Sequence, residues 1–336
     1  MKKLTVIGGG SWGTALALAL APRFENVSLW VFEPHLAADL QATRQNDVFL
    51  PGIRIPDNIA VTSDLETAVR ATDIALGVMP SHVARSVYKN VQPFLAPGVP
   101  VVSATKGLEG GSLLRISQVM EEVLGAANPI AVLSGPSFAK EVAAGSPTAV
   151  VAASKEDAVA ELVQAAFSGP TFRVYASDDP TGVEIGGALK NVIAIGAGMC
   201  DGLGLGHNAL AALITRGLAE LTRLATTLGA KRDTLSGLAG LGDLVLTCTG
   251  DLSRNRQVGL KLASGLGLGQ ITSGTPMVAE GVKTTAVVVD LASRFGVEMP
   301  ISQEVHAVLN LGRSPGEAIE RLMTRTLRRE SEMEKR

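Results

Sequence analysis

One lysine of this sequence stands in a segment that is otherwise almost wholly small and apolar. Lys190 lies in GGALKNVIAIGAG. Burial there would lower its pKa, because a low-dielectric interior disfavours the charged amine, and such a lysine is a candidate general acid–base. The alternative is a structural lysine that reaches solvent. Gly186 and Gly187, each roughly 1 kcal/mol less favourable than Ala in a helix, predict close approach by a ligand or another backbone.

An aspartate in a second apolar segment needs a partner. Asp243 lies in GLAGLGDLVLTCTG, where an unpaired carboxylate would be costly to bury. A lysine or a hydroxyl group of a ligand would satisfy it. Thr247 follows four residues later and shares its face if the segment is helical.

Two polar features of the first half follow predicted strands. Lys106 stands between an apolar strand and a glycine, and the turn SGPSF contains Gly135 and Ser137. In a doubly wound sheet, ligands bind beyond the carboxyl ends of the strands. A backbone amide at Gly135 and the Ser137 hydroxyl therefore predict contacts with a small polar ligand, and a plain loop is the alternative.

A helix start in the second half suits a phosphate group. In DLSRNR, Ser253 is a candidate N-cap and Arg254 follows it directly. Free amides at a helix start, together with a guanidinium, form a phosphate receptor. The alternative for Arg254 is an ordinary surface position.

The chain opens MKKLTVIGGGSWGTALALALAP, which superficially resembles a secretory signal peptide. Its glycines would break the apolar core of such a peptide. They fit G-x-G-x-x-G between a predicted strand and a predicted helix, with Gly8 for the tight turn, Gly10 for approach of the diphosphate and Gly13 for helix–strand packing. We therefore expect a dinucleotide-binding turn, although an ordinary strand–helix connection has the same outline.

The end of the second predicted strand bears on the choice of cofactor. Glu33 follows Gly13 by 20 residues, where a carboxylate can accept hydrogen bonds from the ribose of NAD and repel the extra phosphate of NADP. The sequence thus predicts NAD as the preferred cofactor over NADP. A surface glutamate is the alternative, and Arg44 is a nearby cation that would offset the repulsion.

Strand and helix patterns alternate through the first half. This alternation predicts an α/β fold, with an N-terminal Rossmann-like, mostly parallel sheet domain over 1–178 and an all-helical C-terminal substrate-binding domain over 179–336. The two adjacent strands near residues 130–153 are candidates for an antiparallel pair. The strands are expected at 3–7, 26–33, 73–79, 100–105, 129–135, 147–153 and 171–177, with a longer loop at 46–58.

Composition excludes several classes of function. With 30 basic and 32 acidic residues and no basic stripe, the chain is not expected to bind nucleic acid. Four scattered histidines and two isolated cysteines, Cys200 and Cys248, predict neither a metal site nor a disulfide framework. We expect both cysteines to be small core residues. We also expect that the chain has no membrane-spanning helix and that the protein is cytoplasmic.

These segments together resemble bacterial NAD(P)-dependent glycerol-3-phosphate dehydrogenase. The resemblance runs along nearly the whole chain, and its most specific parts are GPSFAKE, the Lys190 segment, and GLAGLGDLVLTCTG followed by SRNR. It implies reversible hydride transfer between sn-glycerol 3-phosphate and dihydroxyacetone phosphate, which supplies glycerol 3-phosphate for phospholipid synthesis. It also implies a homodimer.

The resemblance assigns a role to each candidate residue. Lys190 matches the family's proton-exchanging lysine, and Lys106 is expected to contact both substrate and cofactor. The other residues expected at the substrate are Gly135, Ser137, Asn191, Asp243, Thr247, Ser253, Arg254 and Asn255; those expected at the cofactor, besides Gly8, Gly10, Gly13 and Glu33, are Ser11, Trp12, Ala139, Arg254, Val278 and Glu280.

One departure from the family pattern concerns the cofactor. Many members carry an arginine near the end of the second strand, where this chain has Phe32 and Glu33, and this puts NADP use in doubt. Two other functions remain open: a dehydrogenase of another small hydroxy acid or phosphate, and a dinucleotide sensor without turnover. A sensor would need neither Lys190 nor Asp243.

Overall fold

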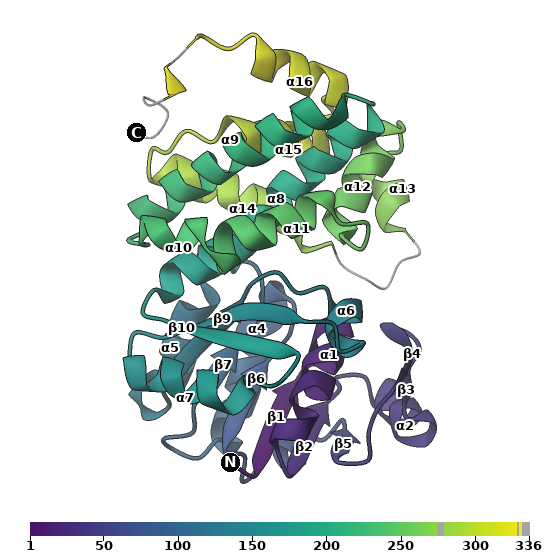
Figure 1. Cartoon of the computed structure of the whole chain (residues 1–336), viewed down its shortest axis with the longest axis vertical. Helices are drawn as coiled ribbons and strands as arrows, with labels where there is room; N and C mark the ends of the chain where they lie inside the picture. Colours follow the sequence, from purple (N-terminus) through teal and green to yellow (C-terminus); the bar gives the residue numbers. More distant parts are fainter. Residues whose placement is uncertain (274–278, 328, 331–336) are drawn as a thin grey trace. The chain divides into compact units, whose positions relative to one another are not determined.

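The computed structural model describes residues 1–273, 279–327, 329 and 330. The chain divides into two compact units, the first made of residues 1–106 and 114–180 and the second of residues 107–113 and 181–336 (Figure 1). The assignment of residues 1–178 to dinucleotide binding and of residues 179–336 to substrate binding stays a prediction.

The first unit is built on an eight-stranded sheet with the order β10-β9-β8-β7-β6-β1-β2-β5. Neighbouring strands are parallel except β8 and β9, which are antiparallel, as expected for the adjacent pair. The chain runs outward from β1 to β2 and β5 and then returns to β6 on the other side of β1. This reversal makes the carboxyl ends of β1 and β6 the place where a ligand is expected. The strands are β1 (Lys3–Ile7), β2 (Asn26–Trp30), β5 (Ile59–Thr62), β6 (Ile74–Gly77), β7 (Val101–Ser103), β8 (Ile130–Ser134), β9 (Thr148–Ala153) and β10 (Phe172–Ser177).

Two apolar clusters form the core of this unit. One gathers the buried residues of α1, α2, α6 and α7, and the other gathers those of α3, α4 and α5. Strands that are apolar on both faces contribute to both clusters, which is why the sequences of these strands are continuous hydrophobic runs. The mostly parallel α/β prediction is confirmed. The helices are α1 (Ser11–Leu20), α2 (Pro34–Thr43), α3 (Leu65–Val69), α4 (Ala84–Val91), α5 (Ile116–Leu124), α6 (Ala139–Ala143) and α7 (Asp157–Phe167).

The segment predicted as a loop over 46–58 is not a plain loop. It contains most of a two-stranded antiparallel hairpin, β3 (Gln45–Asn46) with β4 (Leu50–Arg54). Strand β5 and helix α3, which follow it, were also not expected. These elements are five residues or fewer in length, so hydrophobic periodicity has too few positions in which to appear.

The second unit is helical, as predicted. Its apolar core includes the inner faces of its longest helices. Helix α8 has the length and composition of a membrane-spanning helix, but its apolar window is entirely buried within the structure. Cys200 and Cys248 are free and buried, as expected for small core residues. The helices are α8 (Pro180–Gly202), α9 (Gly206–Thr227), α10 (Arg232–Ser236), α11 (Asp243–Thr249), α12 (Arg254–Ala263), α13 (Leu268–Thr272), α14 (Glu280–Arg294), α15 (Pro300–Asn310) and α16 (Pro315–Met323).

Candidate active site

The glycine turn joins β1 to α1 at the expected ligand end of the sheet. Gly8 adopts a φ of +129°, and a Cβ there would collide with the carbonyl group of Val78. A Cβ at Gly13 would collide with the carbonyl oxygen of Gly8, so α1 starts directly against the turn. Among the described residues, only chain neighbours lie within 4 Å of the place a Cβ of Gly10 would take. This open backbone at a helix N-terminus fits the diphosphate of a dinucleotide.

The first residues of α1 border this turn. Ser11 and Trp12 are half-buried. The indole Nε1 of Trp12 is buried, and it has no hydrogen-bond acceptor among the described residues. These two residues belong to the first turn of α1, whose free amides favour an anion, and their contact with a cofactor remains a prediction.

Glu33 lies at the start of α2 rather than in a strand. Strand β2 ends at Trp30, and Glu33 is the N-cap of α2, because Pro34 begins the helix. Phe32 is 72% exposed and packs edge-on against Trp30, with ring centroids 6.0 Å apart. The predicted strand over 26–33 is thus three residues too long, but its end still presents a half-buried carboxylate beside an exposed ring.

Arg44, the cation expected to offset Glu33, is engaged elsewhere. Its guanidinium donates to the carbonyl oxygens of Ile55 (3.2 Å), Pro56 and Ile59 (2.9 Å). Arg44 also stands in the left-handed conformation, with a φ of +55°, at the C-terminal end of α2. These bonds tie the side chain to the segment between β4 and β5 and to the first residue of β5.

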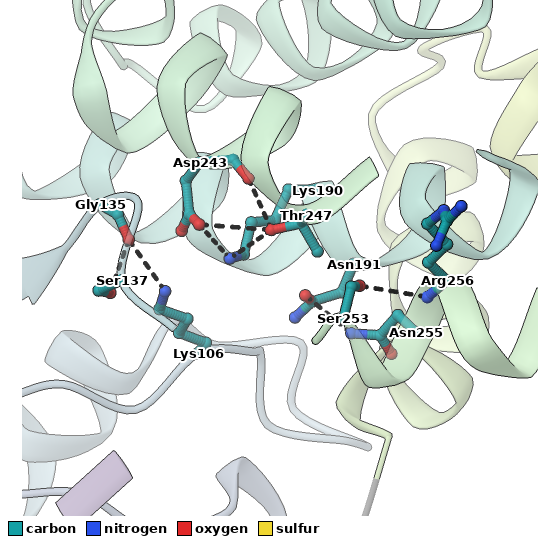
Figure 2. A network of polar contacts seen from close by, with 10 residues as sticks. All are labelled: Lys106, Gly135, Ser137, Lys190, Asn191, Asp243, Thr247, Ser253, Asn255 and Arg256. Carbon is teal, nitrogen blue, oxygen red and sulfur yellow. Dashed lines mark hydrogen bonds and ion pairs between the residues drawn. The ribbon is translucent and has the colours of Figure 1, made fainter. Parts of the chain in front are cut away.

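Three predicted substrate residues of the first unit meet at one carbonyl group (Figure 2). The carbonyl oxygen of Gly135 accepts hydrogen bonds from Lys106 Nζ at 3.2 Å and from Ser137 Oγ at 2.8 Å. Gly135 has a φ of +147°, and a Cβ there would lie 2.9 Å from Val150 Cα. Only glycine fits this turn without strain, and the turn holds the ammonium and the hydroxyl together. Ala139, an expected cofactor contact, begins α6 just after it.

The second unit brings Lys190 and Asp243 into a buried ion pair (Figure 2). Lys190 Nζ also donates to Thr247 Oγ1 at 3.0 Å, and Thr247 Oγ1 donates to the carbonyl oxygen of Asp243 at 2.6 Å. Lys190 is 5% exposed and Asp243 1%. The lysine therefore does not reach solvent as a surface residue would, and it is the partner that the aspartate required.

Close backbone packing sets the position of this pair. A Cβ at Gly186 of α8 would lie 2.5 Å from the carbonyl oxygen of Ala239 and 3.3 Å from Gly240 Cα. Ala239 and Gly240 belong to the short π-helical turn that leads into α11. Gly186 thus lets the backbones of α8 and the π-helical turn approach each other. Of the two predicted reasons for this glycine, close approach of another backbone is the one that the structure shows.

Two asparagines link α8, α12 and the start of α14. Asn255 Nδ2 donates to Asn191 Oδ1 at 3.0 Å, and the backbone N–H of Gly281 donates to Asn255 Oδ1 at 3.0 Å. A Cβ at Gly281 would lie 2.7 Å from both Asn191 O and Asn255 Oδ1. Gly281 was not predicted as a site residue, because nothing near it in the chain shows that two distant asparagines crowd it.

The start of α12 has the predicted form. Ser253 Oγ accepts the backbone N–H of Arg256 at 3.2 Å, which confirms Ser253 as the N-cap. Arg254 is exposed, yet partial desolvation lowers the pKa of its guanidinium, and the negative charge of Glu280 opposes that shift. Glu280 is half-buried at the first position of α14. Val278, the remaining expected cofactor contact, lies outside the described residues.

Both halves of the chain match one enzyme family. Models of the N-terminus and the C-terminus of NAD-dependent glycerol-3-phosphate dehydrogenase match residues 3–160 and 179–320. A glycerol-3-phosphate dehydrogenase (NAD(P)+) of Koribacter versatilis is 52% identical over 329 residues, which cover 97% of this chain and 98% of that protein. The enzyme of the same name from Geobacter sulfurreducens is 53% identical over 331 residues, or 98% and 99% of the two chains. The crystal structure of glycerol-3-phosphate dehydrogenase from Coxiella burnetii superposes with a TM-score of 0.93 at 40% identity, over 96% of this chain and 99% of that chain.

Proposed function

The chain belongs to the NAD-dependent glycerol-3-phosphate dehydrogenase family, and we propose that it catalyses reversible hydride transfer between sn-glycerol 3-phosphate and NAD(P)+. The products of the oxidation are dihydroxyacetone phosphate and NAD(P)H. The observation that carries this proposal is the buried pair of Lys190 and Asp243, with Thr247 as the second partner of the lysine. An enzyme that removes or returns the proton of a substrate hydroxyl group requires such an acid–base group, whereas a protein that only binds the dinucleotide does not.

In the direction of reduction, Lys190 donates a proton to the C2 oxygen as the ketone becomes a hydroxyl group. In oxidation it takes the same proton back. Asp243 holds the ammonium in place and stabilises its charge, and Thr247 limits its rotation. A nicotinamide cofactor, when bound, supplies or accepts the hydride.

The proposed phosphate site is the start of α12. Ser253 caps this helix while Arg254, which is exposed, provides a guanidinium for bidentate contact with phosphate oxygens. Asn191 and Asn255 hold this helix start to α8 through their side-chain hydrogen bond. Lys106 and Ser137, gathered at the carbonyl of Gly135, contribute an ammonium and a hydroxyl for the polar part of the substrate.

For the cofactor, Gly8, Gly10 and Gly13 form the diphosphate turn. The contacts assigned around it are those of Ser11, Trp12, Lys106, Ala139, Arg254, Val278 and Glu280. Glu33 favours NAD over NADP, and this preference is supported by the engagement of Arg44 with the carbonyl groups of Ile55 and Ile59. The arginine is not placed to attract a 2′-phosphate while those bonds hold.

The wider role follows from the reaction class. Glycerol 3-phosphate made by reduction would enter phospholipid synthesis, and we place the enzyme in the cytoplasm as a homodimer. These assignments extend the family relationship. Gel filtration with light scattering tests the dimer directly: a single peak at the monomer mass, near 34.7 kDa, would contradict it.

The deciding assay is oxidation of NADH by the purified protein with dihydroxyacetone phosphate. Turnover with this substrate and none with an unphosphorylated keto acid supports the proposal. Turnover only with a keto acid would indicate a dehydrogenase of a related hydroxy acid, since Lys106 and Arg254 would also bind a carboxylate. NADH binding without turnover on any of these substrates would indicate a dinucleotide sensor.

A further inference from the structure

A buried asparagine of the hairpin β3–β4 contacts the glycine turn from one side. Asn46 is 1% exposed and belongs to the two-residue strand β3. Its Nδ2 donates to the carbonyl oxygen of Gly9 at 2.9 Å and to Thr14 Oγ1 at 2.8 Å, and its Oδ1 accepts the backbone N–H of Phe49 at 3.2 Å. Thr14 Oγ1 in turn lies 3.3 Å from the carbonyl oxygen of Gly9, to which it donates. Both ends of the amide are therefore engaged.

The carbonyl of Gly9 and the N–H of Gly10 belong to the same peptide unit. In a planar trans peptide these two groups point in opposite directions, so a bond that fixes the carbonyl also fixes the N–H. Asn46 thus directs the Gly10 N–H away from the hairpin. Gly10 is the N-cap of α1, and the space beside its Cα is open.

The crowding around Gly9 restricts the turn further. A Cβ at Gly9 would lie 2.6 Å from a methyl carbon of Val31, so this peptide packs closely against the chain that follows β2. Gly8 and Gly10 flank Gly9, and these glycines make the turn flexible in the unfolded chain. The turn therefore needs contacts with other segments to hold it in a single conformation. The side-chain amide of Asn46 supplies such a contact from a segment 37 residues away in sequence.

We propose that Asn46 is a positioning residue for the cofactor: by holding the Gly9 carbonyl, it aims the Gly10 N–H at the diphosphate. This inference rests on the proposed function, because it takes the turn to bind a dinucleotide. It also assigns a role to the hairpin, which anchors the turn through one asparagine. Loss of this amide frees the peptide to rotate and removes one hydrogen bond to a charged phosphate, worth roughly a 10- to 100-fold change in affinity.

The test compares two substitutions of buried asparagines by aspartate. Asn46→Asp keeps the shape and the acceptor for Phe49 but places an oxygen against the carbonyl of Gly9. Asn128→Asp is the matched control, because Asn128 Nδ2 also donates to two backbone carbonyl groups, those of Ala96 (2.8 Å) and Val99 (3.0 Å), away from the glycine turn. The ligand is ADP-ribose, which carries the diphosphate and undergoes no hydride transfer, and its Kd is measured by calorimetry.

We expect both variants to lose thermal stability, and only Asn46→Asp to bind ADP-ribose about 10- to 100-fold more weakly at pH 8. Below the pKa of the new carboxyl group, its O–H can again donate to the Gly9 carbonyl, so affinity in this variant recovers toward pH 5.5 relative to wild type. If Asn46→Asp does not fold, Thr14→Val replaces it. That substitution removes one of the two donors to Gly9 and is expected to weaken binding several-fold.

Three results would overturn the inference. The first is a folded Asn46→Asp or Thr14→Val protein with the wild-type Kd. The second is equal weakening in Asn128→Asp, which would indicate a general effect of lost stability. The third is weakening with no recovery at low pH, which would indicate that the donated hydrogen bond does not matter. Failure of wild type to bind ADP-ribose is a different result, and it would contradict the proposed cofactor site itself.

Discussion

At the residue scale, the arrangement around Lys190 combines burial with an ion pair and a second hydrogen bond. An ammonium removed from water is costly unless a counter-charge and further partners replace the solvent. Asp243 provides the charge and Thr247 an oxygen, so the lysine is held in one orientation. A buried lysine with fixed partners suits proton exchange with a substrate, since little reorganisation is needed when the proton moves.

Replacing Lys190 tests this role. We expect Lys190→Ala to lower kcat by about 10²- to 10⁴-fold while leaving the Kd of NADH within a few-fold of wild type. Lys190→Arg is the control for charge alone, because a guanidinium pairs with Asp243 but does not release its proton near neutral pH. Steady-state kinetics and NADH titration measure both effects. A wild-type kcat in either variant would remove Lys190 from the proton-transfer step.

The role proposed for Arg254 is to bind the substrate and not to take part in the chemical step. Its exposed guanidinium at the start of α12 suits a phosphate group that does not react. We expect Arg254→Ala to raise the KM of dihydroxyacetone phosphate by roughly 10- to 100-fold, as for the loss of hydrogen bonds to a charged group. The variant Arg232→Ala, at the start of the short helix α10, serves as a surface control. An unchanged KM in Arg254→Ala would show that the phosphate binds elsewhere.

Glu33 carries the prediction on cofactor choice. A 2′-phosphate beside this carboxylate would lose ribose hydrogen bonds and meet a like charge, and each effect costs about 1–3 kcal/mol. We expect kcat/KM for NADH to exceed that for NADPH by roughly tenfold or more, and Glu33→Arg to narrow the gap. Equal values for the two cofactors in wild type would show that Glu33 does not contact the ribose.

At the element scale, a buried carboxylate from another helix accepts hydrogen bonds from the first backbone N–H groups of helix α15. Glu220 of α9 accepts the backbone N–H groups of Ile301 (2.6 Å) and Ser302 (3.1 Å), and it is 1% exposed. Burial raises the pKa of this carboxyl group to about 7, although the hydrogen bonds from Ile301 and Ser302 and the charge of Arg223 oppose the shift. A side chain 81 residues away in sequence from Ile301 thus caps the helix.

This cap predicts a pH dependence of stability. Because the folded pKa of Glu220 lies above its usual value of 4.5, the native state keeps a proton that the unfolded chain releases, and stability falls as pH rises from about 4.5 through 7. Between pH 5 and 8 the loss is on the order of 2 kcal/mol, and Glu220→Gln should remove it. Chemical denaturation at several pH values measures the slope.

An exposed cap provides the control for that experiment. Glu317 accepts from the N–H and the hydroxyl group of Ser314 at the start of α16, and these bonds lower its pKa. Glu317→Gln should therefore remove a loss of stability that occurs as pH falls below about 4.5, and leave the slope between pH 5 and 8 as in wild type. The same slope in wild type and Glu220→Gln would contradict the assignment.

Small residues govern how the helices of the second unit pack. A Cβ at Gly198 of α8 would collide with the carbonyl oxygen of Arg256, and one at Gly259 of α12 would collide with that of Ile195. The two backbones therefore touch at both glycines. This contact fixes α12 against α8 and so fixes the start of α12, with Arg254 and Asn255, relative to Asn191 on α8.

At the scale of the whole molecule, the family match covers the helical half as well as the sheet half, so neither is an addition to an unrelated enzyme. Both cysteines of the chain lie in the helical unit. Cys200 is 7% exposed and Cys248 0%. Burial raises the pKa of Cys200 to about 11 and that of Cys248 to about 12, so neither forms much thiolate near neutral pH.

The two thiols therefore report on unfolding of the second unit. We expect no reaction with a disulfide reagent such as DTNB in the native protein at pH 8, and two thiols per chain in denaturant. The reaction rate at intermediate denaturant should follow loss of helical circular dichroism. Rapid reaction of either cysteine in the native protein would show that the helical core opens independently of global unfolding.

Features that depend on residues near one another in the chain could be predicted from the amino-acid sequence. These are the glycine turn after β1, the N-cap at Ser253, the alternation of strands and helices, and the long apolar helix that carries Lys190. Each depends on residues within a turn or two of one another, so propensity and spacing are enough to predict it. The antiparallel pair β8–β9 was predicted for the same reason, because the two strands are adjacent along the chain.

Contacts between residues far apart in the chain could not be predicted and emerge from the folded structure. Lys190 and Asp243 are 53 residues apart, and the sequence required a partner for the aspartate without naming it. The segment 46–58 read as a loop because its strands are too short for a periodic pattern, and the bond from Asn46 to Gly9 joins it to a turn 37 residues earlier. Such contacts depend on the path of the whole chain and on the glycines that let backbones touch, and no local pattern contains that information.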